Sequence, residues 1–345
     1  MEAAMKTRSL FGALLSTALA LAGGPAAAQD SSRLTVANVG GTYNEVVQKS
    51  IVAPLQSGGK LSITTDVGTH AVRLTKLVTE RGQPGTYDVV QFPDYFMHQA
   101  NAYGLMQNLD QSRIKRWGDV VPAFRRAYAV PHIFSAAVLV YDPARVQEEP
   151  ASYAVFWDPK YKGRVGALDF MYPQWLWMAS TQAGNTSNRD FDKGWEKLAA
   201  LKQAGLRVFP TQEALDSAIK SGQVWLTMNY RARAAQLEKA GIKIRTVVPK
   251  EGAYPVSFSF GIPKNARNKE GAYAYLNQIL APAAQKAAAE RIYYAPVVSD
   301  AQVSEEIERT IGFTPEEVKR FIDVDFEYVA KSSPAWRQRW EEQVK

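Results

Sequence analysis

The spacing of hydrophobic and polar residues alternates along the chain between the period of a strand and the period of a helix. Residues 34–39 and 61–66 alternate with a period of two, as half-buried strands do, and residues 87–92 form a short apolar strand. Residues 71–81 and 93–103 carry apolar side chains at helical spacing between and after these strands. Strands that alternate with helices predict an α/β fold with largely parallel sheets.

The same alternation continues to the end of the chain. Residues 136–141 and 224–228 are predicted strands, and a helix capped by Thr211 precedes the second of them. Apolar residues within 272–280 are spaced as on one face of a helix. Residues 314–317 (TPEE) form a capping box with proline at the first helical position, so a further helix is predicted to begin there.

The N-terminal segment has the charge pattern of a secretory signal peptide. Lys6 and Arg8 precede an apolar run, residues 10–22, which small residues end at Ala28. This order predicts that residues 1–28 are removed by cleavage next to Ala28, and the run is too short to span a membrane. The chain has no cysteine, which excludes disulfides and a lipid-anchoring cysteine. We therefore expect a soluble protein of the periplasm.

Composition and motifs exclude several classes of protein. The formal net charge is +7, but the basic residues are scattered among acidic ones, so we expect no nucleic-acid partner. We also expect the protein to be a monomer. The chain lacks Gly-x-Ser-x-Gly, a phosphate-binding loop and His-Glu-x-x-His. The three histidines, His70, His98 and His132, have no metal-ligand spacing. The sequence therefore predicts neither an enzyme nor a bound cofactor or metal.

Three loops follow predicted strands at their carboxyl ends, where open α/β sheets bind ligands. They are Gly40, Gly41, Thr42 and Tyr43; Phe92, Pro93, Asp94 and Tyr95; and Asn229, Tyr230 and Arg231. The first group would offer backbone N–H groups at a helix start, which suits an anion, although its glycines could serve only a tight turn. Arg231 is expected to bind a ligand carboxylate through its guanidinium, although it could also lie on a helix surface.

Several motifs in a fixed order carry a resemblance to a known family. They are Gly40-Gly41-Thr42-Tyr43, residues 87–90 (YDVV) and 103–106 (YGLM), 156–165 (FWDPKYKGRV), 249–253 (PKEGA), 262–270 (IPKNARNKE) and 294–297 (YAPV). Through them the chain resembles the family 1 extracellular solute-binding proteins of ABC importers, in the branch that contains the spermidine/putrescine-binding proteins. The resemblance covers nearly the whole chain after residue 28.

The resemblance implies a type II periplasmic binding protein fold, with two α/β lobes and a ligand cleft between them. It places two hinge crossings near residues 140–142 and 255–260. Lobe one would then comprise residues 30–140 and 261–345, and lobe two residues 141–260. The C-terminal helices could pack on either lobe. The resemblance also implies that the cleft closes on a small organic solute and that the closed protein delivers it to an ABC permease in the inner membrane, which a cytoplasmic ATPase energises.

The polyamine-binding relatives carry ligand contacts in further segments, which adds candidates here. They are Asp169, Tyr172, Trp175 and Phe258. Trp175 could equally be a core aromatic. Where those relatives place an aromatic and a carboxylate, this chain has Val256 and Phe258, and Pro173 replaces a second carboxylate.

These departures bear on the ligand. An ammonium group left unpaired in a closed cleft is costly, so the sequence favours a carboxylate- or phosphonate-bearing solute, or a zwitterion whose amine binds Asp169 or Asp94. Binding of putrescine or spermidine is the alternative. Tyr293 and Tyr294 resemble the tyrosine pair of ferric-binding relatives but stand at another position. A ferric-ion-binding protein and a hydrolase are the remaining alternatives.

Overall fold

The computed structural model describes residues 32–185, 189 and 191–345, and the predicted signal peptide lies outside this part of the chain. The strands are β1 (Arg33–Asn38), β2 (Ser62–Val67), β3 (Val89–Pro93), β4 (Val130–Tyr141), β5 (Val165–Leu168), β6 (Arg207–Phe209), β7 (Leu226–Tyr230), β8 (Arg245–Val247), β9 (Tyr254–Gly261) and β10 (Ala295–Pro296). The α-helices are α1 (Gly41–Val47), α2 (Ala53–Ser57), α3 (His70–Thr79), α4 (Asp94–Ala102), α5 (Tyr172–Gln182), α6 (Asp192–Gln203), α7 (Gln212–Lys220), α8 (Arg231–Lys239), α9 (Lys269–Ile279), α10 (Pro282–Ile292), α11 (Glu305–Ile311), α12 (Pro315–Lys319) and α13 (Phe326–Gln343). A π-helical segment, Gln48–Val52, joins α1 to α2.

The strands form one mixed sheet in the order β2-β1-β3-β9-β4-β7-β5-β6, with β8 and β10 also paired to β4. Parallel pairing is confined to two groups, β2-β1-β3 and β7-β5-β6. The long strands β4 and β9 lie antiparallel between these groups and connect them. Each parallel group with its helices is one lobe, so the predicted two-lobed α/β fold is confirmed.

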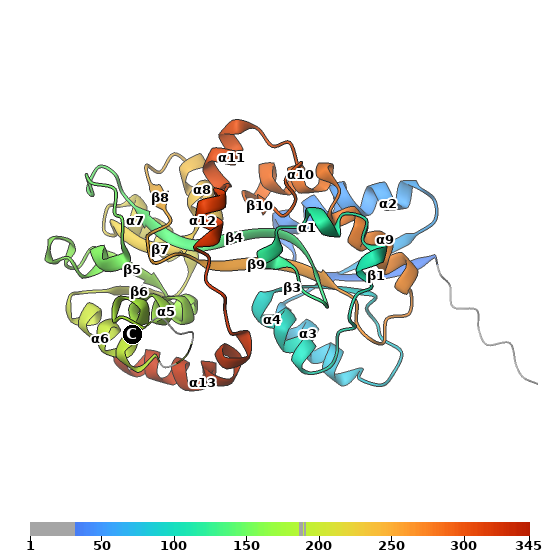
Figure 1. Ribbon diagram of the computed structural model, residues 1–345, viewed down its shortest axis with the longest axis horizontal. Helices are drawn as coiled ribbons and strands as arrows, with labels where there is room; N and C mark the ends of the chain where they lie inside the picture. The colour runs from blue at the N-terminus through green and yellow to red at the C-terminus, as the bar shows by residue number, and fades with distance from the viewer. Residues whose placement is uncertain (1–31, 186–188, 190) are drawn as a thin grey trace, which may run out of the picture. The chain divides into compact units, whose positions relative to one another are not determined.

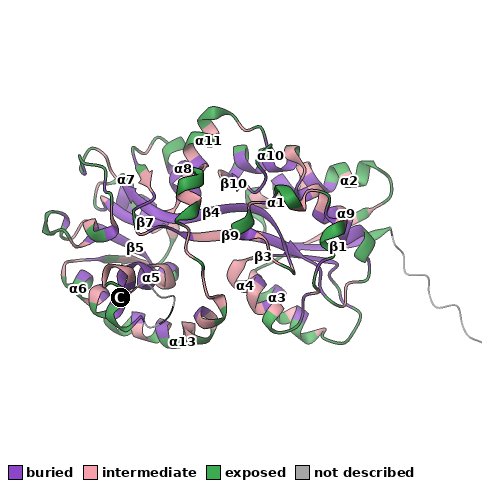
Figure 2. Cartoon of the chain, viewed as in Figure 1, coloured by how far each residue is buried: buried purple, intermediate pink, exposed green. Residues whose placement is uncertain are grey.

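Each lobe has its own hydrophobic core. One cluster of buried side chains joins β5 and β7 to α5, α6 and α7. Two others join β1 and β3 to α9 on one side and to α3 and α4 on the other. Figure 1 shows α5 and α6 on the opposite side of the strands from α7 and α8, and Figure 2 shows that the strands between the helices are largely buried. This burial on both faces explains why the strands read as apolar runs.

Local sequence signals determine where several helices begin and end. Thr211 accepts a hydrogen bond from the backbone N–H of Ala214, as its predicted capping role requires. Thr314 and Glu317 make both hydrogen bonds of the predicted capping box. Gly104 follows α4 with a φ of +70°, a conformation that favours glycine at a helix end.

The register indicates where the chain passes between the lobes. Ala137 on β4 pairs with Tyr254 on β9 and with Tyr230 on β7, so pairing passes from one group to the other at this residue. We propose that the first crossing lies near Ala137, a few residues before the expected 140–142. The second lies within Tyr254–Gly261, which contains the expected 255–260.

The last helix packs on α5 and α6 of the second lobe and also contacts α4 of the first. Val329, Trp336 and Trp340 of α13 belong to the same core cluster as α5 and α6. We therefore propose that α13 is part of lobe two, which is one of the two placements that the sequence left open for the C-terminal helices. Among the helices of the described residues, none is both long and apolar enough to cross a membrane.

Candidate ligand-binding site

A cavity of about 310 Å³ lies where residues of both lobes meet. Its walls come from the end of β3 and the start of α4, the start of α5, the end of β7, the start of β9, and α13. The lining residues are Pro93, Asp94, Tyr95, Phe96, Phe170, Tyr172, Pro173, Gln174, Tyr230, Tyr254, Pro255, Val256, Phe326, Val329 and Ser333. This volume is at the small end of the range for ligand pockets, so it suits a small solute.

Strand ends deliver the polar side chains to this cavity. Pro93 is the last residue of β3 and has an extended backbone, so Asp94 becomes the first residue of α4. Tyr172 begins α5, with Pro173 in its first turn, shortly after β5 ends. Tyr230 is the last residue of β7. These are carboxyl ends of parallel strands, where the sequence analysis expected the ligand.

Asp94 is the only charged residue among the described residues that line the cavity. Its Oδ1 accepts a hydrogen bond of 2.7 Å from Ser257 Oγ, and its Oδ2 accepts one from the Ser257 backbone N–H. No ion pair found among the described residues involves Asp94. Burial raises the pKa of its carboxyl, and the Ser257 hydrogen bonds and the charge of Arg126 offset only part of that rise. A desolvated carboxylate of this kind is stabilised by a bound cation.

Aromatic rings surround this carboxylate. Tyr95 and Phe96 meet edge to face at 5.4 Å, and Phe170 is half exposed at the rim. Tyr172 donates a 3.4 Å hydrogen bond to the Ser333 carbonyl. The remaining rings are Tyr230, Tyr254 and Phe326. Ring faces attract cations, most strongly where water is excluded, so the aromatic lining and the carboxylate favour the same kind of ligand.

Two polar groups on the wall can orient a ligand. Gln174 Nε2 donates to the Tyr230 hydroxyl at 3.4 Å, while Gln174 Oε1 is buried without a protein partner. Burial raises the pKa of Tyr230, so its phenol stays protonated and can donate a hydrogen bond. A buried acceptor without a partner is costly, and a donor on a bound solute would satisfy it.

The structure brings together five of the residues expected at the site: Pro93, Asp94, Tyr95, Tyr172 and Tyr230. Other expected residues lie outside the cavity. Gly40, Gly41 and Thr42 are exposed at the start of α1. The Tyr43 hydroxyl lies 2.9 Å from His132 Nδ1, and Phe258 packs against the rings of Tyr43 and Tyr294.

Three more expected residues are part of the packed interior and do not line the cavity. Trp175 is fully buried and its ring lies 5.2 Å from that of Phe156. Asn229 is buried within β7, and its Oδ1 accepts from the backbone N–H of Tyr230. Phe92 is fully buried and stacks on Phe96 at 6.1 Å. Phe92 and Asn229 lie on strands with two covered faces, where side chains pack inward, and Trp175 lies on the face of α5 that packs into the core.

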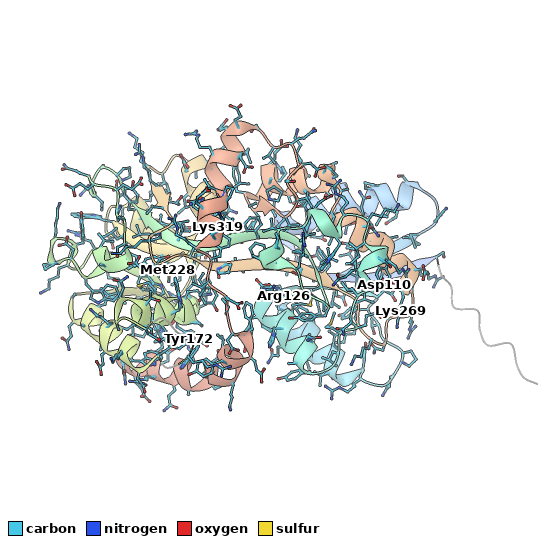
Figure 3. The ribbon with its side chains drawn as sticks, viewed as in Figure 1. Asp110, Arg126, Tyr172, Met228, Lys269 and Lys319 are labelled. Atoms are coloured by element: carbon cyan, nitrogen blue, oxygen red, sulfur yellow. The ribbon has the colours of Figure 1, made fainter. Side chains whose placement is uncertain are left out.

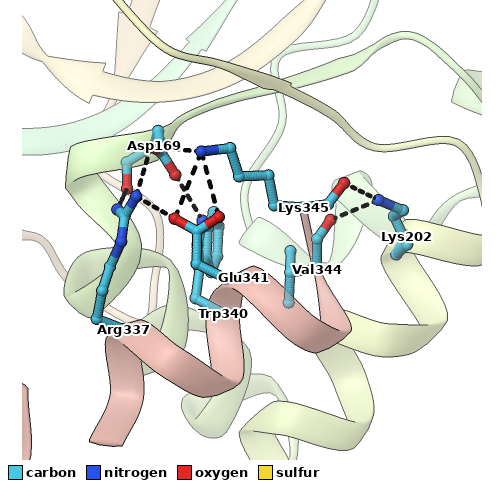
Figure 4. A network of polar contacts seen from close by, with 7 residues as sticks. All are labelled: Asp169, Lys202, Arg337, Trp340, Glu341, Val344 and Lys345. Atoms are coloured by element: carbon cyan, nitrogen blue, oxygen red, sulfur yellow. Dashed lines mark hydrogen bonds and ion pairs between the residues drawn. The ribbon is translucent and has the colours of Figure 1, made fainter. Parts of the chain in front are cut away.

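Asp169 also has a different role from the expected one. Its Oδ2 pairs with Arg337 Nη2 at 2.8 Å and with Lys345 Nζ at 3.2 Å, and its Oδ1 accepts from Trp340 Nε1 at 2.9 Å (Figure 4). Burial raises the pKa of Asp169, but these three hydrogen bonds outweigh it and the net shift is downward. The carboxylate holds the last helix, and its charge is already paired with two cations.

The expectation for Arg231 needs the largest correction. The strand ends at Tyr230, two residues later than expected, and Arg231 becomes the first residue of α8. Its guanidinium pairs with Glu317 at 2.8 Å, donates to the Gly312 carbonyl and lies 4.0 Å from the centre of the Phe313 ring. Arg231 therefore ties α8 to the segment around α12 and does not line the cavity.

This ion pair predicts a stability effect without an affinity effect. Arg231→Ala would leave Glu317 without its buried partner, so the free energy of unfolding should fall by about 3 kcal/mol. Ligand affinity should stay unchanged. Lys286→Ala, which removes an exposed pair with Glu290, should cost about 0.5 kcal/mol or less. Denaturant unfolding of both variants tests this, and an Arg231→Ala protein of normal stability with weakened ligand binding would contradict it.

The sequence analysis missed several lining residues. Phe170 and Gln174 flank residues that it did select, and Tyr254 immediately precedes the expected second crossing. Their closeness in sequence to the expected residues and to the expected crossing is the signal that could have identified them. Phe326, Val329 and Ser333 come from α13, whose sequence carries no motif that points to the site.

The comparisons with known proteins agree with this fold. The family model described as bacterial extracellular solute-binding protein matches residues 56–315. The chain belongs to this family. A spermidine/putrescine-binding periplasmic protein of Escherichia coli is 26% identical over 298 residues, covering 81% of this chain and 82% of the relative. A gamma-aminobutyric acid-binding protein of Pseudomonas aeruginosa is 22% identical over 286 residues, covering 80% of each chain.

Solved structures share the architecture of this solute-binding protein. The crystal structure of an ABC transporter protein from Clostridium perfringens has a TM-score of 0.80 at 22% identity, covering 90% of this chain and 100% of that chain. The family match makes this protein an extracellular solute-binding protein, and the structural likeness shows that it shares the fold of an ABC transporter protein.

Proposed function

We propose that this protein captures a small solute that carries an ammonium group, and that the ammonium binds at Asp94. One observation carries the proposal: Asp94 is the only charge among the described residues of an otherwise uncharged and largely aromatic cavity. A cation entering the cavity gains a desolvated counter-ion and several ring faces at once. An anion would meet a like charge there.

The preference for an anionic solute rested on Arg231 and on the departures from the polyamine pattern, and the pairing of Arg231 with Glu317 removes the first of these grounds. Zwitterions and polyamines, both considered from the sequence, fit Asp94. The names of the two relatives support an amine, since spermidine, putrescine and gamma-aminobutyric acid all contain an amino group. The amine is therefore the shared feature that we assign to the ligand of this protein.

The proposal includes the place and manner of action. The protein is exported, cleaved next to Ala28 and active as a monomer in the periplasm. Closure of two lobes around a solute is the established mechanism of periplasmic binding proteins. The bound solute is released unchanged, without catalysis, to an ABC permease in the inner membrane.

A thermal-shift screen with primary amines, polyamines, amino acids and carboxylates tests the assignment. A ligand that binds only the folded state at a hundred times its Kd stabilises that state by about 2.7 kcal/mol, which is easily detected. We expect amine-bearing solutes to raise the melting temperature and simple carboxylates to leave it unchanged. A response to carboxylates alone would overturn the proposal.

The affinity should also depend on pH in a defined direction. A bound ammonium favours the ionised form of Asp94, so binding lowers a pKa that burial raises in the free protein. The affinity for the amine then has its full value above this raised pKa and falls as the pH drops through it. Calorimetry between pH 8 and about pH 4 should show weakening that begins at a higher pH than an ordinary aspartate would produce. An affinity independent of pH over this range would argue against Asp94 as the counter-ion.

A further inference from the structure

A second, smaller cavity of about 200 Å³ adjoins the first. The two share Asp94, Pro255 and Phe326 in their linings, so a solute held at Asp94 lies next to both. The rest of the second cavity is formed by the loop before β4 and by the stretch from the end of α12 to the start of α13. The residues from these two stretches are Ala123, Phe124, Arg126, Val318, Phe321, Ile322, Asp323 and Val324.

Arg126 is the cation in the lining of this second cavity. Its Nη1 donates to the backbone carbonyls of Ala123 and Arg125, both at 3.0 Å, which fixes the position of the guanidinium. The side chain is half-buried, and no ion pair found among the described residues includes it. In Figure 3, Arg126 lies near the start of α4, and Tyr172 marks the α5 side of the first cavity.

The charge of Arg126 reaches the groups around both cavities. Burial raises the pKa of Asp94, and Arg126 counteracts that rise. The acidic groups around it are Asp94 and Asp323, which line the same cavity. The two cavities together thus present one cation, Arg126, and the carboxylates of Asp94 and Asp323, and no ion pair found among the described residues joins Arg126 to either carboxylate.

We infer that Arg126 binds an anionic group on the far end of the ligand, so that the solute is a zwitterion of the ω-amino acid type and not a diamine. This inference rests on the proposed capture of an amine at Asp94. A carboxylate placed against a fixed guanidinium forms charge-assisted, often bidentate, hydrogen bonds. A second ammonium at the same place would be repelled by Arg126. Arg126 is therefore the residue that selects between the two classes of amine.

Three four-carbon probes that differ at one end separate these classes: 4-aminobutanoate, putrescine and butylamine. Calorimetry on the full chain should show 4-aminobutanoate binding at least about tenfold more tightly than butylamine, and putrescine more weakly than 4-aminobutanoate. Arg126→Gln should lower the affinity for 4-aminobutanoate at least about tenfold and leave butylamine unchanged. Arg126→Lys keeps the charge and should lose less.

Arg125→Gln is the matched control, because the Arg125 guanidinium bonds the carbonyls of Gly118 and Val120 away from this cavity. It should leave all three affinities as they are. If the wild type prefers putrescine, or if Arg126→Gln and Arg126→Lys keep the full preference for 4-aminobutanoate, the role of Arg126 is wrong while amine capture stands. If none of the three probes binds, the capture of amines itself fails, and the inference about Arg126 fails with it.

Discussion

Asp94→Asn should weaken the binding of an amine-bearing solute at least about a hundredfold. The substitution keeps the volume of the side chain but removes the only charge among the described residues of the cavity wall. An ammonium ion left without its counter-ion in a desolvated site loses about 3 kcal/mol or more, which corresponds to at least two orders of magnitude in Kd. Titration calorimetry with the best solute from the screen measures the change.

The fold should tolerate this substitution. The asparagine oxygen can still accept from the Ser257 N–H, and its amide can donate to Ser257 Oγ. Asp110→Asn is a matched control, since Asp110 is exposed and only caps a short turn at Ser112. The control should bind normally. Normal binding in Asp94→Asn as well would show that the solute does not bind at this carboxylate.

Trp340→Ala should lower the free energy of unfolding by about 3–5 kcal/mol. Trp340 is fully buried, contacts Tyr172 at a ring distance of 6.4 Å and donates from Nε1 to Asp169. Its removal creates a large cavity between α13 and α5 and leaves Asp169 with fewer partners. Because α13 also contributes Phe326 and Ser333 to the ligand cavity, affinity should fall together with stability.

A conservative variant separates the two contributions of this residue. Trp340→Phe keeps most of the packing and loses the hydrogen bond to Asp169, so it should cost about 1–3 kcal/mol. Denaturant unfolding at pH 7 measures both variants. If Trp340→Ala were as stable as the wild type, α13 would not be docked on the second lobe in solution.

The interaction of Asp169 with α13 also sets an acid limit on stability. Its folded-state pKa is lowered, so its contribution is present above the ordinary aspartate pKa and is lost as the pH falls through the folded value. Glu317 behaves in the same way, because its hydrogen bonds to Arg231 outweigh the effect of burial. These two sets of ion pairs, which tie the C-terminal segment to the rest of the protein, thus weaken in acid.

The sequence predicted the fold well because the relevant signals are local or follow from topology. Periods of two and 3.6 residues marked most elements, and the capping residues Thr211 and Thr314 located two helix starts. The rule that ligands bind at the carboxyl ends of parallel strands led to Asp94, Tyr95 and Tyr230, all of which line the cavity.

The misplaced residues depend on partners far along the chain. The sequence predicted that Asp169 contacts the ligand, but its carboxylate is bound by Arg337, Trp340 and Lys345, which lie more than 160 residues later. Arg231 is paired with Glu317, 86 residues later. No local pattern shows that such a charge is already neutralised, because the pairing is created by tertiary packing.

The most direct test of the account is a crystal structure with the strongest amine from the thermal-shift screen. The account predicts that the ammonium nitrogen lies within hydrogen-bonding distance of Asp94 and that the solute contacts Tyr95, Tyr172 and Tyr230. A solute bound instead beside Gly40–Tyr43, with no contact to Asp94, would contradict it.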